Sequence, residues 1–310
     1  MAENRLLDYF NNLLYTFKAI FHHPLTSKRK LAAMKRWLSW QIGSRLVPGA
    51  VAVPFVNQTK LLVKPRMHGA TLNVYVGLDE FSDMSFLLHF LRPTDLFIDV
   101  GASVGTYTVL ASGAVGCHTI AFEPTCEAFE NLEANINLNG IRDLVECYPI
   151  ALGDEKGKIK FTKGLDTLNY IVLSPAMTGL ELTEVEVTTL DTALGQKEPT
   201  LIKIDVEGYE WAVISGGEET LGKPSLQAIV IEINENCRRY GVKLEHTFER
   251  ITDYGFTACR YNPEKRQLTE VKKEAWKESR QTNTIFVRDI QVSKDRVKTA
   301  NSFRVLGYDV

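Results

Sequence analysis

Hydrophobic residues in this chain form short runs that alternate with segments of helical periodicity. The apolar runs predict strands at 96–100, 119–122, 144–152, 228–236 and 282–288, and a strand, an acidic turn and a helix over 201–211. Apolar positions three and four apart predict helices at 77–91, 125–139 and 244–253. Strands that alternate with helices in this way are typical of an α/β domain with a parallel or mostly parallel sheet.

The alternation lapses between residues 157 and 190. There the pattern predicts short strands around a loop that carries threonine, asparagine and tyrosine. We interpret this segment as a β insertion before the fourth strand of the sheet. Insertions at the ligand edge of a sheet often shape substrate pockets, so we expect this one to contact the substrate.

The N-terminal segment is basic and has its own pattern. An apolar stripe over 5–21 and a basic segment over 27–42 predict two helices, and 50–63 predicts a small hairpin. Residues 1–46 hold eight lysines and arginines against two acids. These helices could pack on their own domain, form a homodimer contact, or lie on an anionic membrane surface. We expect this segment to reach residue 74, a main domain over 75–290 and a tail over 291–310.

Composition narrows the function classes. The 310 residues are 45% hydrophobic and 24% charged with a net charge of −2, which indicates a globular protein and argues against a dedicated nucleic-acid binder. The five cysteines are scattered without a C-x-x-C pair, which favours a reducing compartment. The pattern contains neither a membrane-spanning apolar segment nor a signal-peptide layout, so we expect a cytoplasmic protein.

The most informative stretch runs from Asp95 to Pro124. It predicts a buried strand, a turn with Gly101 and Gly105, a helix, and a second strand that ends at Glu123. A carboxylate at that strand tip can accept hydrogen bonds from both hydroxyls of a ribose. The glycine spacing is G-x-x-x-G rather than the G-x-G-x-x-G of dinucleotide sites, so a nucleoside ligand without phosphates fits better.

Acidic residues occur where further strands end: Asp205, Glu207 and Glu232, with Asp154 just past another strand. Asp205 could serve as a base for an incoming hydroxyl. Asp205 and Glu207 could instead cap the following helix.

Lys203 should share a sheet face with Asp205 and could hold it ionised. Glu232 is then either a site acid or the partner of Lys203. Clustered carboxylates can bind magnesium, but no ligand spacing indicates it, and we expect no metal. His246 is more typical of a surface or capping histidine than of a base.

Five segments together resemble one enzyme family. They are F-I-D-V-G-A-S-V-G-T-Y at 97–107, A-F-E-P at 121–124, A-L-G-D at 151–154, L-I-K-I-D-V-E-G-Y-E at 201–210 and I-V-I-E-I-N-E at 229–235. The chain resembles the FkbM-type S-adenosylmethionine-dependent methyltransferases, which mostly methylate hydroxyls of sugars and secondary metabolites. The resemblance implies a Rossmann-like class I methyltransferase sheet.

The resemblance also implies roles for single residues. Asp99, Gly101 and Gly105 would contact the methionine part of S-adenosylmethionine, Glu123 its ribose, and Asp154 would lie near the adenine. Asp205, Glu207 and Gly208 would line the transfer site. Ser103 stands where the family commonly has asparagine, and because serine keeps a hydrogen-bonding group we expect cofactor binding to survive.

We therefore expect an O-methyltransferase with Asp205 as the base and Glu207 and Glu232 beside it. The acceptor would be a hydroxyl of a small molecule or glycan. Two alternatives stay open: a nicotinamide-dependent oxidoreductase, disfavoured by the missing third glycine, and a non-catalytic cofactor-binding protein that docks through its basic N-terminus.

Overall fold

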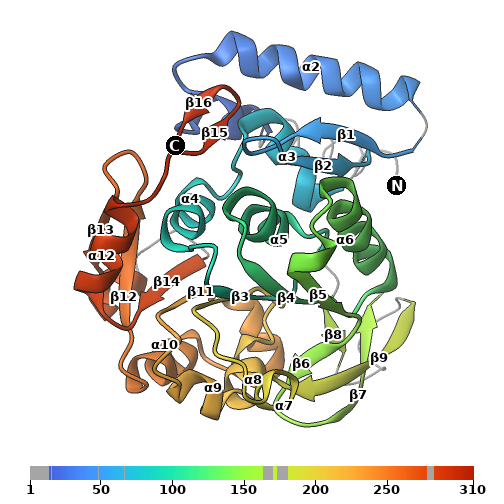
Figure 1. Cartoon of the computed structure of the whole chain (residues 1–310). Coiled ribbons are helices and arrows are strands. Elements are labelled where there is room, and N and C mark those ends of the chain that lie inside the picture. The colour runs from blue at the N-terminus through green and yellow to red at the C-terminus, as the bar shows by residue number, and fades with distance from the viewer. Residues whose placement is uncertain are drawn as a thin grey trace.

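The computed structural model describes residue 14 and residues 16–47, 49–65, 67–162, 170–172, 181–277 and 283–310. Its main sheet has eight strands in the order β13-β12-β14-β11-β10-β3-β4-β5 (Figure 1). The strands of this sheet are β3 (Leu96–Val100), β4 (His118–Phe122), β5 (Val145–Tyr148), β10 (Leu201–Ile204), β11 (Ala228–Glu232), β12 (Thr257–Asn262), β13 (Gln267–Glu270) and β14 (Asn283–Val287).

Five neighbouring strands, β11, β10, β3, β4 and β5, run parallel. The strands β14, β12 and β13 continue the sheet with antiparallel pairings. This is the mostly parallel α/β sheet that the sequence pattern and the resemblance predict.

Helices cover both faces of the main sheet (Figure 1). One face carries α4 (Phe81–Phe90), α5 (Thr106–Thr108) with the π-helical turn η1 (Val109–Val115), and α6 (Cys126–Asn139). The other carries α8 (Glu210–Ser215), α9 (Glu218–Gly222) and α10 (Leu244–Asp253). Alternate strand residues therefore belong to different cores: Phe97 and Leu201 face the α4 side, while Ile98 and Ile202 face the α8 side.

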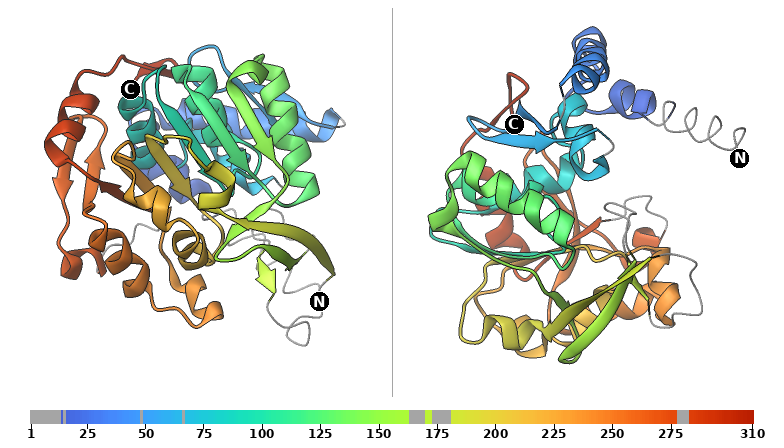
Figure 2. Two further views of the ribbon diagram at one scale, coloured as in Figure 1. Left: turned by 60° about the horizontal axis from the view of Figure 1, so that its bottom comes forward. Right: turned by 90° about the vertical axis from the view of Figure 1, so that its right-hand side faces the viewer.

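The predicted insertion forms a second sheet of four strands in the order β6-β9-β7-β8 (Figure 2). This sheet lies beside α8. Its strands are β6 (Ala151–Gly153), β7 (Gly157–Thr162), β8 (Ile171–Val172) and β9 (Leu182–Thr189), followed by α7 (Leu190–Leu194). The expected single strand over 144–152 is wrong, because β5 belongs to the main sheet and β6 to the insertion. Pro149 lies between them and has no N–H to continue a ladder.

The N-terminal and C-terminal segments pack on the α4–α6 layer. They comprise α2 (Lys30–Leu46), the hairpin β1 (Val51–Pro54) and β2 (Lys60–Val63), α3 (His68–Val76), α12 (Ile290–Lys298), and the small hairpin β15 (Arg304–Val305) and β16 (Tyr308–Asp309). Val56 and Val305 form a bridge between the two segments, and both are fully buried. Side chains from all these parts join one core. The domain boundaries expected at residues 74 and 290 stay a prediction.

The sequence pattern did not predict α3, α7, α9, β12, β13, α12, β15 or β16. The remaining described elements are η2 (Arg142–Leu144), the 3-10 helix η5 (Glu235–Tyr240) and α11 (Lys273–Lys277). The strand predicted over 228–236 ends at Glu232, and η5 follows it. No helix in the described part of the chain is both long and apolar enough to cross a bilayer.

Candidate functional site

The site lies where the order of strands reverses. From β3 the chain proceeds to β4 and β5 on one side, and later to β10 and β11 on the other. Ligands of open α/β sheets bind beyond the carboxyl ends of the strands at such a switch point. The residues two positions before Asp99, Lys203 and Glu232 belong to the core on the α4 side of the sheet. Because side chains alternate between the two faces along a strand, these three side chains lie on the same face.

The turn after β3 requires glycine at position 101. Gly101 has a φ of +78°, and a Cβ built there would lie 1.9 Å from the backbone oxygen of Asp205. The amide of Asp205 in turn donates to the carbonyl oxygen of Val100 at 3.0 Å. The two loops at the switch point are therefore in direct backbone contact.

Glu123 holds the same turn from the other side. One carboxylate oxygen accepts a hydrogen bond from the Ser103 amide at 2.9 Å, and the other accepts from the amide and hydroxyl of Thr125. Burial raises the pKa of Glu123, and these donors oppose the shift. Ser103 itself has a φ of +50°, the left-handed region. The predicted ribose acid thus lies against the glycine turn.

Asp99 is buried at the end of β3. One of its oxygens accepts from the Thr108 hydroxyl at 2.7 Å, while the other has no hydrogen-bond partner among the described residues. Burial raises the pKa of Asp99, and the nearby Lys203 ammonium opposes that shift. A buried carboxylate oxygen without a donor is costly unless a ligand supplies one.

Lys203 pairs with Asp205, as the strand alternation predicts. Its ammonium nitrogen lies 2.8 Å from an Asp205 oxygen and 4.6 Å from the centre of the Tyr107 ring. Burial alone would lower the pKa of Lys203, but the carboxylates of Asp205, Glu80 and Asp99 raise it above its ordinary value. Among the described residues, Lys203 forms its ion pair with Asp205 and not with Glu232.

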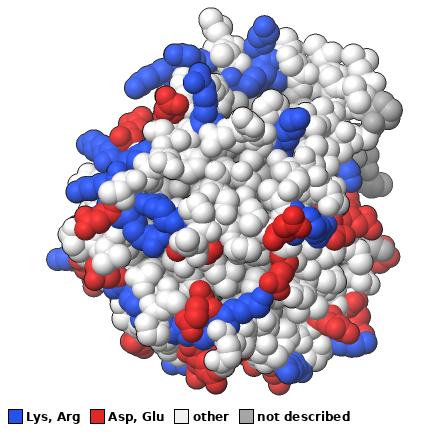
Figure 3. Space-filling model, in the orientation of Figure 1, with Lys and Arg blue, Asp and Glu red and all other residues white. Residues whose placement is uncertain are grey.

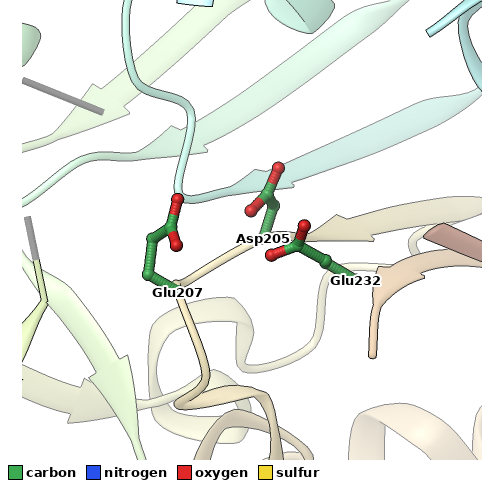
Figure 4. A group of neighbouring side chains, drawn as sticks. All are labelled: Asp205, Glu207 and Glu232. Carbon is green, nitrogen blue, oxygen red and sulfur yellow. The ribbon is translucent and has the colours of Figure 1, made fainter. Parts of the chain in front are cut away.

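Asp205, Glu207 and Glu232 converge at the edge of the sheet (Figure 4). One oxygen of each lies within 4.8 Å of those of the other two, a separation that suits a shared cation as well as a hydrogen-bonded acceptor. Burial, followed by the charge of Asp205, raises the pKa of Glu207 to about 7. The same causes, together with the charge of Glu207, raise the pKa of Glu232 to about 9.

Helix capping does not account for these acids. The turn before α8 is held by Glu210, which accepts from the amides of Val206 and Gly208 at 3.1 Å each. The side chain of Glu207 instead accepts from the Asn236 side chain at 3.2 Å. Glu207 has a φ of +55°, so its backbone is strained at the point where its side chain faces the site.

Sequence reasoning missed Glu80 and Asn283. Glu80 accepts from the Tyr107 hydroxyl at 2.7 Å and from the Asn283 side chain, and it adds to the negative charge around Lys203. Glu80 immediately precedes α4, where an acid is normally interpreted as a cap, yet it makes no side-chain capping bond. Asn283 is the register partner of Glu232, and its buried side-chain oxygen has no partner among the described residues.

The other predicted residues lie further from this edge. Gly105, with a φ of +83°, allows close packing on Leu132 of α6, where a Cβ would come within 2.5 Å of a side-chain carbon. Asp154 is exposed at the end of β6 in the insertion sheet. His246 is exposed with its ring 6.1 Å from that of Trp211, in agreement with a surface histidine.

One side of the site is formed by η5 and the insertion. Tyr240 packs edge-on against Tyr209, and its hydroxyl donates to the Ile171 carbonyl at 3.0 Å. Arg239 is exposed and lies 4.4 Å from the centre of the Tyr170 ring. Asn236 and Arg239 are three residues apart on a 3-10 helix, so they share the face turned to Glu207. The arrangement combines aromatic rings with an arginine beside the acidic edge.

Comparison with protein families identifies a methyltransferase domain in this chain. The model of the methyltransferase FkbM domain matches residues 99–258. The hexuronic acid methyltransferase AglP of Haloferax volcanii is 22% identical over 215 residues, which cover 68% of this chain and 84% of that protein.

Solved structures with similar folds include two methyltransferases. An rRNA methylase from Streptococcus thermophilus is 13% identical, with 66% of this chain and 91% of that chain covered and a TM-score of 0.38. An S-adenosylmethionine-dependent O-methyltransferase from Thermotoga maritima is 13% identical, with 73% of this chain and 65% of that chain covered and a TM-score of 0.36. The family match spans more than half of the chain and includes both the glycine turn and the acidic turn, and the protein therefore belongs to the FkbM methyltransferase family.

Proposed function

We propose that this protein transfers the methyl group of S-adenosylmethionine to a hydroxyl of a sugar, glycan or secondary metabolite. The observation that carries the proposal is the convergence of Asp205, Glu207 and Glu232 beside the glycine turn, at the switch point of the sheet. The family match supports methyl transfer over the oxidoreductase alternative. The name of the Haloferax relative supports a sugar-derived acceptor.

The residues of the turn fit this cofactor. The buried oxygen of Asp99 that has no partner among the described residues suits an ammonium donor such as that of the methionine part. We assign Asp99, Gly101, Ser103 and Gly105 to the methionine side, Glu123 to the ribose and Asp154 to the adenine end. Several carboxylates around the single Lys203 ammonium favour a ligand that carries positive charge.

The chemistry asks little of the protein beyond position and a base. S-adenosylmethionine supplies a methyl group on positively charged sulfur, already activated for displacement. The acceptor oxygen forms its bond to the methyl carbon as the carbon–sulfur bond breaks, and the electron pair of that bond stays on sulfur. Asp205 takes the hydroxyl proton, and Lys203 fixes the orientation of its carboxylate. Glu232, protonated near neutral pH, donates a hydrogen bond to the acceptor.

A substitution at position 205 tests whether Asp205 is the base. Asp205→Asn should lower kcat by about 10² to 10⁴ while the affinity for S-adenosylhomocysteine changes little. Asp253→Asn, on an exposed helix end, is the matched control. Normal turnover of the Asp205 variant would remove Asp205 as the base.

The side chains beside the acidic edge suggest that the acceptor is a sugar acid. Arginine stacked on a tyrosine ring keeps its planar fork available for a carboxylate, and Arg239 has this arrangement with Tyr170. Arg239→Gln should raise KM for a uronic acid acceptor at nearly constant kcat. Arg238→Gln is the control, because Arg238 pairs with Glu235 on the surface. Equal KM values for the two variants would place the carboxylate of the acceptor elsewhere.

The stability of the methylated product in alkali shows whether a hydroxyl or a carboxylate accepts the methyl group. Labelled S-adenosylmethionine should yield an alkali-stable methyl ether on uronic acids or neutral sugars. An alkali-labile ester would mean that a carboxylate is the acceptor; it has no proton to lose, so Asp205→Asn would then keep its turnover. Methylation of an amine or of nucleic acid in place of both would overturn the proposal.

We also propose that no divalent metal is required. Lys203 already supplies the counter-charge to Asp205, and Glu232 is neutral near pH 7. Activity should therefore persist in EDTA. Loss of activity in EDTA with recovery on added magnesium would instead assign Asp205, Glu207 and Glu232 as metal ligands.

A further inference from the structure

The outer face of α2 is apolar although it faces solvent. Leu31, Leu38, Ile42 and Leu46 are 88%, 52%, 54% and 75% exposed. They are spaced seven, four and four residues apart, so at 100° per residue they lie within about 80° of one another around the helix. Figures 1 and 2 show α2 as an outermost element, above the hairpin and α3.

The inner face of α2 is already occupied. Ala33, Trp40 and Ser44 are buried, and Arg36 donates to the Tyr75 carbonyl at 2.8 Å. The helix is therefore anchored to the protein by one face, while the apolar stripe on its outer face stays largely exposed. Single exposed hydrophobic residues are ordinary, but a continuous stripe along four turns marks an interaction surface.

The part of the chain that contains the stripe carries positive charge. The sequence contains no aspartate or glutamate between Asp8 and Asp79 and ten lysines and arginines in that interval. Lys35 and Arg45 lie on the outer face itself, and both are exposed. In Figure 3 basic side chains are visible along the top of the molecule, where Figure 1 places α2.

We propose that the outer face of α2 docks on an anionic lipid surface. The leucine and isoleucine side chains would enter the boundary between headgroups and acyl chains, and the lysines and arginines would contact the headgroups. A second copy of the chain is a poorer occupant, because two such stripes would bring like charges together. A nucleic acid would leave the apolar stripe exposed.

Vesicle sedimentation tests the docking with the full chain. The protein should bind vesicles of phosphatidylcholine with about 30% phosphatidylglycerol and should bind pure phosphatidylcholine weakly, and salt should reduce the binding. Replacing one leucine or isoleucine that enters the lipid should lower the partition coefficient for the vesicles roughly tenfold. The double variant Leu38→Asn/Ile42→Asn should therefore reduce binding about a hundredfold.

Two controls separate the stripe from other effects. Val292→Asn alters an exposed hydrophobic residue on α12 and should leave vesicle binding unchanged. Thermal unfolding of the double variant should match the parent, because these side chains are outside the core. Absence of vesicle binding by the parent, or binding that the double variant retains, would overturn the proposal. A concentration-dependent dimer in light scattering that the double variant abolishes would assign the stripe to a second copy instead.

Discussion

The buried ammonium of Lys203 lies 2.8 Å from the carboxylate of Asp205, two residues further along the chain. The pair joins β10 to the acidic turn, and Asp99 and Glu80 add further negative charge around the same ammonium. Removing the cation would leave these partly buried carboxylates without compensation. Lys203 is thus central both to the stability of the edge and to the position of the proposed base.

Lys203→Met should destabilise the protein by about 3 kcal/mol, because breaking a buried pair leaves uncompensated charge. Chemical denaturation measures the loss. Lys158→Met, which breaks the exposed pair with Glu184, should have little effect. Equal effects of the two substitutions would show that the Lys203 pair contributes no more than a surface pair.

Gly101→Ala should both destabilise the protein and abolish cofactor binding, since its Cβ would collide with the Asp205 carbonyl. Gly116→Ala is a matched control: its φ is +88°, but no atom lies within 4 Å of the added Cβ. The control should lose roughly 1–2 kcal/mol from backbone strain alone and keep cofactor binding. Similar losses for both would mean that strain, and not contact with Asp205, explains the glycine.

Glu232 should make stability depend on pH. Its pKa is raised from 4.5 to about 9 in the folded protein. The unfolded chain therefore releases this proton first, and the contribution of Glu232 to stability is present below pH 4.5 and is lost as pH rises toward 9. Glu232→Gln should raise Tm relative to the parent at pH 8 but not at pH 4.5. A Tm lowered at pH 8 would contradict the assigned protonation.

Glu123→Ala should weaken cofactor binding by roughly 10- to 150-fold, the equivalent of the 1.5 to 3 kcal/mol expected for hydrogen bonds to a charged group. It also removes the acceptor for the Ser103 amide, which shapes the turn. Calorimetry with S-adenosylhomocysteine measures the change. Unchanged affinity would remove Glu123 from the cofactor site.

Local sequence patterns predicted the strand, glycine turn and Glu123, because each of these signals lies within one short stretch. The convergence of Asp205 and Glu232 also followed from sequence, since parallel strands bring their carboxyl ends to one edge. Glu80 and Asn283 could not be predicted in this way. They are 203 residues apart, and Asn283 reaches the site through the antiparallel register of β14 with β11.

Two other features of the structure could not be predicted from the hydrophobic pattern. Pro149 divides one apolar stretch between two sheets, which a count of hydrophobic residues does not reveal. The sequence predicted a basic helix over 27–42 but could not indicate that Trp40 faces the protein while Leu38 faces solvent. Both faces of that helix are apolar, so only tertiary packing separates them.

The measurement that tests the central claim most directly is calorimetric titration of the purified protein with S-adenosylhomocysteine, with NAD and NADP as controls. The account predicts saturable binding of S-adenosylhomocysteine alone, with binding abolished in Gly101→Ala. Binding of a nicotinamide cofactor without binding of S-adenosylhomocysteine would contradict the proposed cofactor site.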